Sequence, residues 1–137
     1  MHEVAYISTY IDKTPDSVYE FASNPTNLPK WAAGLARSGV RQEGDAWVAD
    51  APIGRVRIRF AQQNRFGVMD HDVEPESGPV VHNPMRVVPN GEGAEFVFTL
   101  IRRPGMSDEQ FAADRSAVER DLSTLKRLLE SSPPRSP

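Results

Sequence analysis

Hydrophobic residues recur every three or four positions over a long stretch near the end of the chain. Between Ser107 and Glu130 they form a stripe, which consists of Phe111, Val118, Leu122, Leu125 and Leu129. This spacing predicts one long amphipathic helix. Ser107 and Gln110 have the spacing of a capping box, in which two side chains satisfy backbone N–H groups at a helix start. The apolar stripe needs a partner surface, because a helix buries such a face against another element.

The first thirty residues predict a strand followed by two short helical segments. Apolar and polar residues alternate from Val4 to Asp12, which is typical of a strand. Thr14-Pro15 then has the residues of a helix start, and Asn24-Pro25 ends that helix. Residues 25–31 form a second short turn or helix, and residues 32–34 a linker.

The middle of the chain predicts six strands separated by tight turns. We expect them at residues 35–42, 46–50, 55–62, 66–73, 79–88 and 95–101. Asn90-Gly91 is the strongest hairpin signal. Pro84 interrupts the fifth of these strands, which indicates a sheet edge or a bulge and a place where a homodimer could form.

These elements predict an α+β fold in the order β-α-α-β6-α. Short turns between consecutive strands favour an antiparallel meander. A curved antiparallel sheet of about seven strands would wrap around the C-terminal helix and cover its apolar stripe. We expect residues 1–130 to form one domain, and the Pro/Ser-rich tail 131–137 to be disordered.

Several segments resemble the START/birch-pollen-allergen superfamily, also called SRPBCC or polyketide cyclase/dehydrase-like. They are TPDSVYEFASNPTNLPKW, NRFGVMDHDV, PMRVVPNGEGAEFVFTL and VERDLSTLKRLLE. The resemblance is to a small bacterial-type member and covers roughly residues 4 to 130. It implies a helix-grip fold, in which sheet and helix enclose a cavity for a hydrophobic ligand such as a lipid, polyketide or aromatic compound.

Composition narrows the classes of partner. The net charge of −3 implies no general affinity for nucleic acid. The absence of cysteine excludes disulfides and thiolate metal sites. We found no signal peptide and no apolar run long enough to span a membrane. A cytoplasmic protein with no metal, no cofactor and no integral membrane contact is therefore expected.

The long helix divides into two unequal halves. Leu122 to Leu129 is solidly apolar and is interpreted as an anchor, whereas Asp114 and Arg115 intrude between Phe111 and Val118. Asp121 lies at the edge of the stripe. The polar half is either exposed at the helix start or forms a lid over a cavity.

The strand predicted at residues 66–73 places a titratable group inside whichever face is buried. If Met69 and Val73 face inward, His71 does too; if Phe66 and Val68 do, Asp70 follows. His71 and Asp70 are the candidate catalytic groups, because either could move a proton in a half-apolar cavity. A hydrogen-bonded structural histidine is the alternative.

Other candidates come from aromatic and charged residues on the predicted strands and helices. Arg86 could bind a ligand carboxylate or lie on the outer face, and Tyr6, Tyr10 and Trp47 could form cavity walls or plain core. The residues predicted to bind a ligand are Trp31, Met69, His71, Arg86, Phe96, Phe98, Phe111, Asp114 and Val118.

Three functions follow as hypotheses. The first is binding of a small hydrophobic or amphipathic molecule between sheet and helix. The second is an enzyme of the polyketide cyclase/dehydrase kind, with His71 or an interior aspartate moving a proton. The third is a protein-interaction module, for example a chaperone-activating domain, that uses the outer sheet face with its Arg55, Arg57 and Arg59 row.

Overall fold

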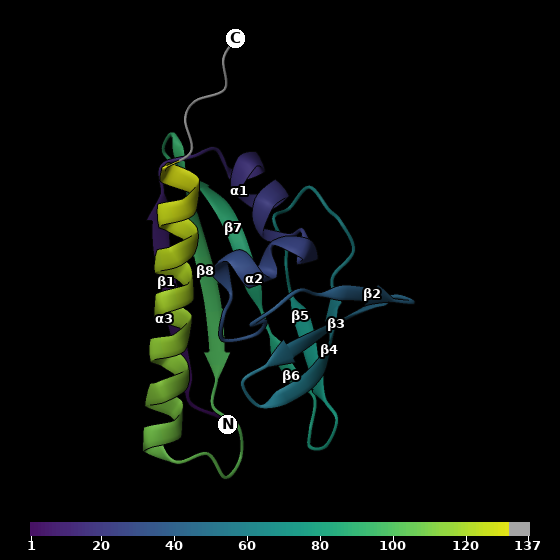
Figure 1. Ribbon diagram of the computed structural model, residues 1–137. Coiled ribbons are helices and arrows are strands. Elements are labelled where there is room, and N and C mark those ends of the chain that lie inside the picture. The colour runs from purple at the N-terminus through teal and green to yellow at the C-terminus, as the bar shows by residue number, and fades with distance from the viewer. Residues whose placement is uncertain (132–137) are drawn as a thin grey trace.

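A computed structural model describes residues 1–131 and shows an α+β architecture (Figure 1). The predicted tail lies outside the described residues except for Ser131, the C-cap of the last helix. The elements in chain order are β1 (Val4–Ile11), α1 (Pro15–Ala22), the 3-10 turn η1 (Pro25–Asn27), α2 (Leu28–Trp31), β2 (Arg41–Glu43), β3 (Ala46–Ala51), β4 (Gly54–Phe60), β5 (His71–Pro75), β6 (Val81–Asn83), β7 (Met85–Asn90), β8 (Gly93–Ile101) and α3 (Asp108–Glu130).

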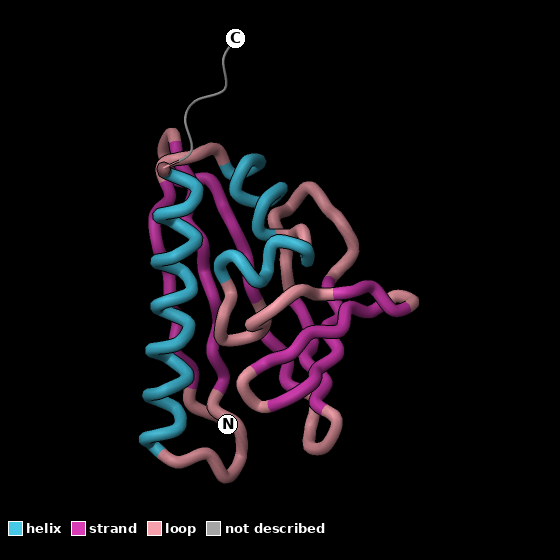
Figure 2. The backbone as a smooth tube through the Cα atoms, viewed as in Figure 1, coloured by secondary structure: helices cyan, strands magenta, loops and turns pink. Residues whose placement is uncertain are grey.

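The strands form two antiparallel sheets, one in the order β1-β8-β7 and one in the order β2-β3-β4-β5-β6 (Figure 2). The residues just before β5 join them, because Met69 N–H donates to Met85 O (2.8 Å) and Val87 N–H donates to Gly67 O (3.0 Å). At this corner the Asp70 carboxylate accepts from Met85 N–H (3.0 Å), which satisfies a backbone donor. The strands thus curve as the predicted helix-grip sheet does.

Three predicted strands differ clearly from the structure, and the others agree to within two residues at each end. Residues 35–40 are not a strand, and β2 begins only at Arg41. The predicted strand 66–73 begins instead at His71, since Gly67 has a φ of +72° that an extended strand does not have. Pro84 divides the predicted strand 79–88 into β6 and β7, because proline has no N–H group to donate to a neighbouring strand. The predicted Asn90-Gly91 hairpin is confirmed.

The α3 helix begins with the predicted capping box, in which Ser107 and Gln110 exchange side-chain-to-backbone hydrogen bonds. Its C-terminal end is tied to β1. Lys126 Nζ donates to Tyr10 O (2.6 Å), and the Glu130 carboxylate accepts from Asp12 N–H (2.8 Å). Within residues 1–131, no helix is long and apolar enough to cross a membrane.

The hydrophobic core lies between α3, the two short helices and the concave face of the strands. Leu122, Leu125 and Leu129 of α3 are buried in it, and Val118 is half-buried. From β8, the core contains the alternate residues Phe96, Phe98 and Leu100. This packing holds α3 along β1, and the middle of the helix shares the lining of one cavity with the five-stranded sheet.

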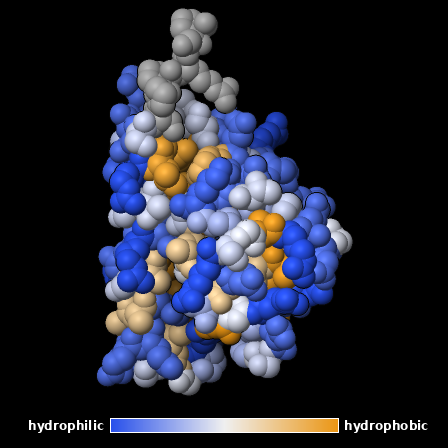
Figure 3. Space-filling model, viewed as in Figure 1, coloured by the Kyte–Doolittle hydropathy of each residue, from blue (hydrophilic) through white to orange (hydrophobic). Residues whose placement is uncertain are grey.

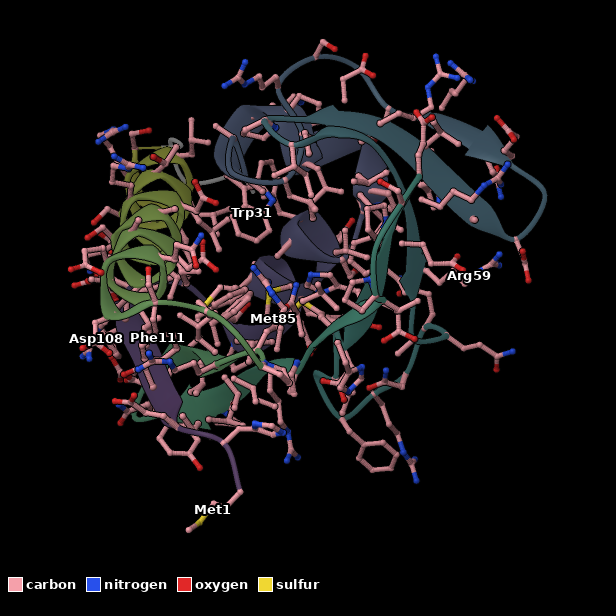
Figure 4. All side chains as sticks on the ribbon, turned by 90° about the horizontal axis from the view of Figure 1, so that it is seen from below. Met1, Trp31, Arg59, Met85, Asp108 and Phe111 are labelled. Atoms are coloured by element: carbon pink, nitrogen blue, oxygen red, sulfur yellow. The ribbon has the colours of Figure 1, made fainter. Side chains whose placement is uncertain are left out.

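The outer face of the five-stranded sheet carries paired charges rather than a free basic row. Arg57 pairs with Glu43 (2.8 Å), and Arg59 pairs with both Asp45 (2.7 Å) and Glu74 (3.1 Å). Figure 4 shows Arg59 pointing away from the interior. Exposed pairs of this kind contribute little to stability.

Candidate functional site

A cavity of about 720 Å³ lies between α3, the chain after α2 and the concave face of the strands. Leu28, Trp31, Val73, Met85, Phe98 and Leu100 give it an apolar interior. Polar side chains from α3, the loops and strands β5 and β6 complete its lining, and they are His71, Asn83, Arg37, Arg103, Asp114, Arg120 and Asp121. In Figure 3 apolar colours lie between α3 and the strands, with hydrophilic side chains on both sides.

Trp31 forms much of the apolar wall. It ends α2, is 4% exposed, and its ring meets Phe96 edge-to-face at a centroid distance of 5.9 Å. Figure 4 shows the Trp31 and Met85 side chains within the ring made by α3, the short helices and the strands. Among the described residues, the Trp31 indole N–H is the one buried side-chain polar group without a hydrogen-bond partner. A buried donor without a hydrogen-bond partner costs free energy. Such a group is rare in folded proteins, and a functional role is one of its explanations.

His71 is the buried titratable group of the cavity. Its Nδ1 lies 3.1 Å from Met69 O, a group that can only accept, so Nδ1 carries the proton. Burial lowers the pKa of His71, and the imidazole is therefore neutral. The Nε2 lone pair is then an acceptor, approached only at 3.5 Å by the Asn83 amide. Phe60 and Phe98 flank the ring. His71 can thus accept a hydrogen bond from a hydroxyl group inside the cavity.

The Asp121 side chain of α3 contacts the loop that follows α2. Burial is the largest influence on its pKa, which rises to about 6 although Gly34 N–H donates to the carboxylate and Arg120 lies nearby. A Cβ built on Gly34 would lie 3.1 Å from Asp121 Oδ2, so the loop backbone approaches the carboxylate closely. This contact closes one wall of the cavity between the helix and residues 33–37.

We expect Asp121→Asn to change how stability depends on pH. The folded-state pKa is raised from 3.8 to about 6, so the folded protein binds this proton more tightly than the unfolded chain does. Wild-type stability therefore falls as pH rises through this window. The full shift corresponds to about 3 kcal/mol, and solvent screening of this partly exposed carboxylate reduces the expected loss to on the order of 2 kcal/mol. Asparagine keeps an acceptor for Gly34 but cannot ionise. Urea denaturation from pH 4 to 8 should show the free energy of unfolding of the variant rising relative to that of wild type as pH increases. If the two free energies changed with pH in parallel, the expectation would be wrong.

The remaining charged residues lie toward solvent. Arg103 pairs with Asp114 at 3.5 Å, and both side chains are about two-fifths exposed. Arg37 and Arg120 are exposed. The cavity is therefore apolar inside and charged at its mouth, and small-molecule sites commonly combine an apolar lining with a few polar groups.

The structure brings some of the predicted ligand-binding residues together and not others. Those that line the cavity are Trp31, His71, Phe98, Asp114 and Val118. Met69, Phe96 and Phe111 are buried core residues outside the lining. The lining part of α3 extends from Asp114 to Thr124, so Phe111 is not part of the predicted lid.

Two other predicted site residues, Arg86 and Asp70, neither line the cavity nor belong to the buried core. Arg86 is exposed on the convex face, where its Nε donates to Phe66 O (3.4 Å). The Asp70 carboxylate satisfies Met85 N–H at the sheet corner. The alternation in residues 66–73 is resolved in favour of Met69, His71 and Val73, which are buried, while Phe66 is 62% exposed. Tyr6 is also exposed, at 71%.

Sequence reasoning missed much of the mouth. Asp121 had a usable signal, its position at the edge of the helical stripe. Arg37 and Gly34 had none, because residues 32–34 were interpreted as a linker and residues 35–42 as a strand, and neither interpretation places a side chain at a cavity mouth. In the sequence Arg103 and Arg120 do not differ from ordinary surface arginines. Only the tertiary structure shows that both line the cavity.

Comparison with known proteins identifies the family. Residues 2–130 match the sequence model of a family described as "Polyketide cyclase / dehydrase and lipid transport". No curated protein matches the chain.

Solved structures of similar fold agree with the match. XoxI from Bacillus cereus has 15% sequence identity and a TM-score of 0.74, over 93% of this chain and 96% of that one. CalU16 from Micromonospora echinospora has 13% identity and a TM-score of 0.71, over 97% and 78%. Ara h 8.0201 has 10% identity and a TM-score of 0.71, over 96% and 100%. The predicted helix-grip superfamily is confirmed.

Proposed function

The chain belongs to the polyketide cyclase/dehydrase and lipid transport family, and on that premise we propose that its cavity binds one small, largely apolar molecule. The observation that carries the proposal is the cavity itself. Its volume of about 720 Å³ lies within the range of small-molecule sites, roughly 300–1,000 Å³, and its interior is apolar.

Binding energy would come from apolar contact and selectivity from a few polar groups. Burial against Trp31, Met85 and Phe98 removes ligand surface from water, at about 25 cal/mol per Å² before the costs of association. His71 Nε2 is a hydrogen-bond acceptor in the cavity lining. A ligand hydroxyl that donates to Nε2 exchanges the hydrogen bond that it made to water for one to the protein. Leaving that acceptor unpaired would disfavour ligands without a donor at this point.

We expect Ala117→Trp to weaken binding at least tenfold, about 1.4 kcal/mol. Ala117 lines the cavity where α3 faces Gly34, and an indole there occupies space that the ligand needs. The measurement is fluorescence titration with the neutral probe N-phenyl-1-naphthylamine.

The matched control is Ala112→Trp on the same helix. Ala112 is exposed and does not line the cavity. The control should keep wild-type affinity. Equal affinity in both variants would place the probe outside the cavity and contradict the proposal, and circular dichroism would verify that both variants remain folded.

A further inference from the structure

The cavity mouth has an excess of positive charge on a chain that is acidic overall. Three arginines line the cavity, Arg37, Arg103 and Arg120, against two aspartates, Asp114 and Asp121. The formal net charge of the whole chain is −3, so this local balance is opposite to the average. Arginine stays protonated throughout the physiological pH range, so these three cations persist at the pH of a binding experiment.

Two of these arginines, Arg37 and Arg120, form no ion pair within residues 1–131, although the charge of Arg120 acts on the nearby Asp121 carboxylate. Arg103 pairs with Asp114 at 3.5 Å. Within residues 1–131, the guanidinium groups of Arg37 and Arg120 form no ion pair and no side-chain hydrogen bond. Arg57, Arg59 and Arg102 show the contrast, since each is paired with a carboxylate at 3.0 Å or less.

The Arg37 and Arg120 side chains come from two different walls of the cavity. Arg120 lies on α3, next to the Asp121 carboxylate that accepts from Gly34 N–H. Arg37 lies three residues after Gly34, and its own backbone N–H donates to Asp50 O in β3 (2.9 Å), which holds this loop against the five-stranded sheet. Both arginines line the same cavity, one from the loop and one from α3, and hydrogen bonds hold the backbone that carries each.

We propose that the ligand is an acidic amphiphile, with its apolar body inside the cavity and its carboxylate or phosphate group at the mouth between Arg37 and Arg120. The inference rests on the proposed function and names the class of ligand. An anion at this position keeps part of its hydration, because both arginines are exposed, so the desolvation cost is small. A guanidinium group also matches the planar geometry of a carboxylate and the oxygens of a phosphate.

The test compares ligands that differ in the head group alone. Dodecanoic acid, dodecyl phosphate and 1-dodecanol should displace N-phenyl-1-naphthylamine at pH 8, where both acids are ionised. We expect at least one acid to bind wild type five- to thirtyfold more tightly than the alcohol at low salt, with the preference falling as salt is added. The two acids compared with each other distinguish a carboxylate from a phosphate ligand.

The variant Arg37→Gln/Arg120→Gln should lose this preference while its affinity for 1-dodecanol stays unchanged. Arg55→Gln/Arg127→Gln is the matched control, because both residues are exposed and neither lines this cavity. It should behave as wild type.

Three results would overturn the inference. Equal binding of alcohol and acids by wild type would refute the proposal of an acidic head group. A preference for acids that survives in Arg37→Gln/Arg120→Gln would also refute it. Either result would leave the proposed binding function of the cavity intact. Failure of all three ligands and of the probe to bind removes both proposals. Thermal melting of each variant separates loss of binding from loss of fold.

Discussion

Leu125→Ala is expected to lower the free energy of unfolding by about 2–5 kcal/mol, the cost of truncating a fully buried leucine. Leu125 is 0% exposed, lies outside the cavity lining and belongs to the half of α3 that packs on β1. The removed methyl groups leave a void that well-packed neighbours cannot fill. Urea denaturation followed by circular dichroism measures the loss.

Leu122→Ala is the matched comparison, with the same chemistry one turn earlier. Leu122 is almost as buried at 2%, but it lines the cavity, so it has fewer packed neighbours to lose. We expect a smaller loss of stability than for Leu125→Ala, together with altered probe affinity. An equal loss in both variants, with probe affinity unchanged in both, would mean that α3 is not divided into an anchor and a cavity wall.

Gly67→Ala is the second large effect, with an expected loss of about 3 kcal/mol or more. Gly67 has a φ of +72°, and a Cβ built there would lie 2.1 Å from Val87 O. The obstacle is backbone rather than a flexible side chain, so the strands themselves must move. Because Gly67 O accepts from Val87 N–H, the change disturbs the contact that joins the two sheets.

Gly39→Ala supplies the control for this position. Nothing lies within 4 Å of a Cβ built on Gly39, and its φ is not positive. Its stability should remain within about 0.5 kcal/mol of wild type. If Gly67→Ala were equally mild, the sheet corner would be more adaptable than its geometry indicates.

The sequence was most informative where local chemistry and periodicity agreed. The capping box at Ser107 and the leucine stripe predicted α3 with its correct start, because both depend on residues a few positions apart. The Asn90-Gly91 turn likewise placed the β7-β8 hairpin. The strand predicted at residues 66–73 failed because alternation alone does not reveal a glycine corner. Gly67 bends the chain, leaving Phe66 exposed and starting β5 at His71.

The site was harder to predict than the fold. His71 and Asp114 could be selected because they interrupt apolar faces, and both line the cavity. Arg86 interrupts a strand in the same way yet lies outside, since alternation does not say which face is concave. The mouth depends on where residues 32–40 cross α3. That crossing is a tertiary contact between irregular backbone and Asp121, and no periodic pattern encodes it.

Nuclear magnetic resonance shift mapping with dodecanoic acid tests the central claim most directly. The backbone amide signals of ¹⁵N-labelled protein are followed while the ligand is added. Binding in the cavity predicts saturable shifts in residues 31–37, His71 to Val73 and Asp114 to Thr124. Shifts confined to the outer strand face around Arg55 to Arg59, or the absence of any saturable shift, would contradict the account.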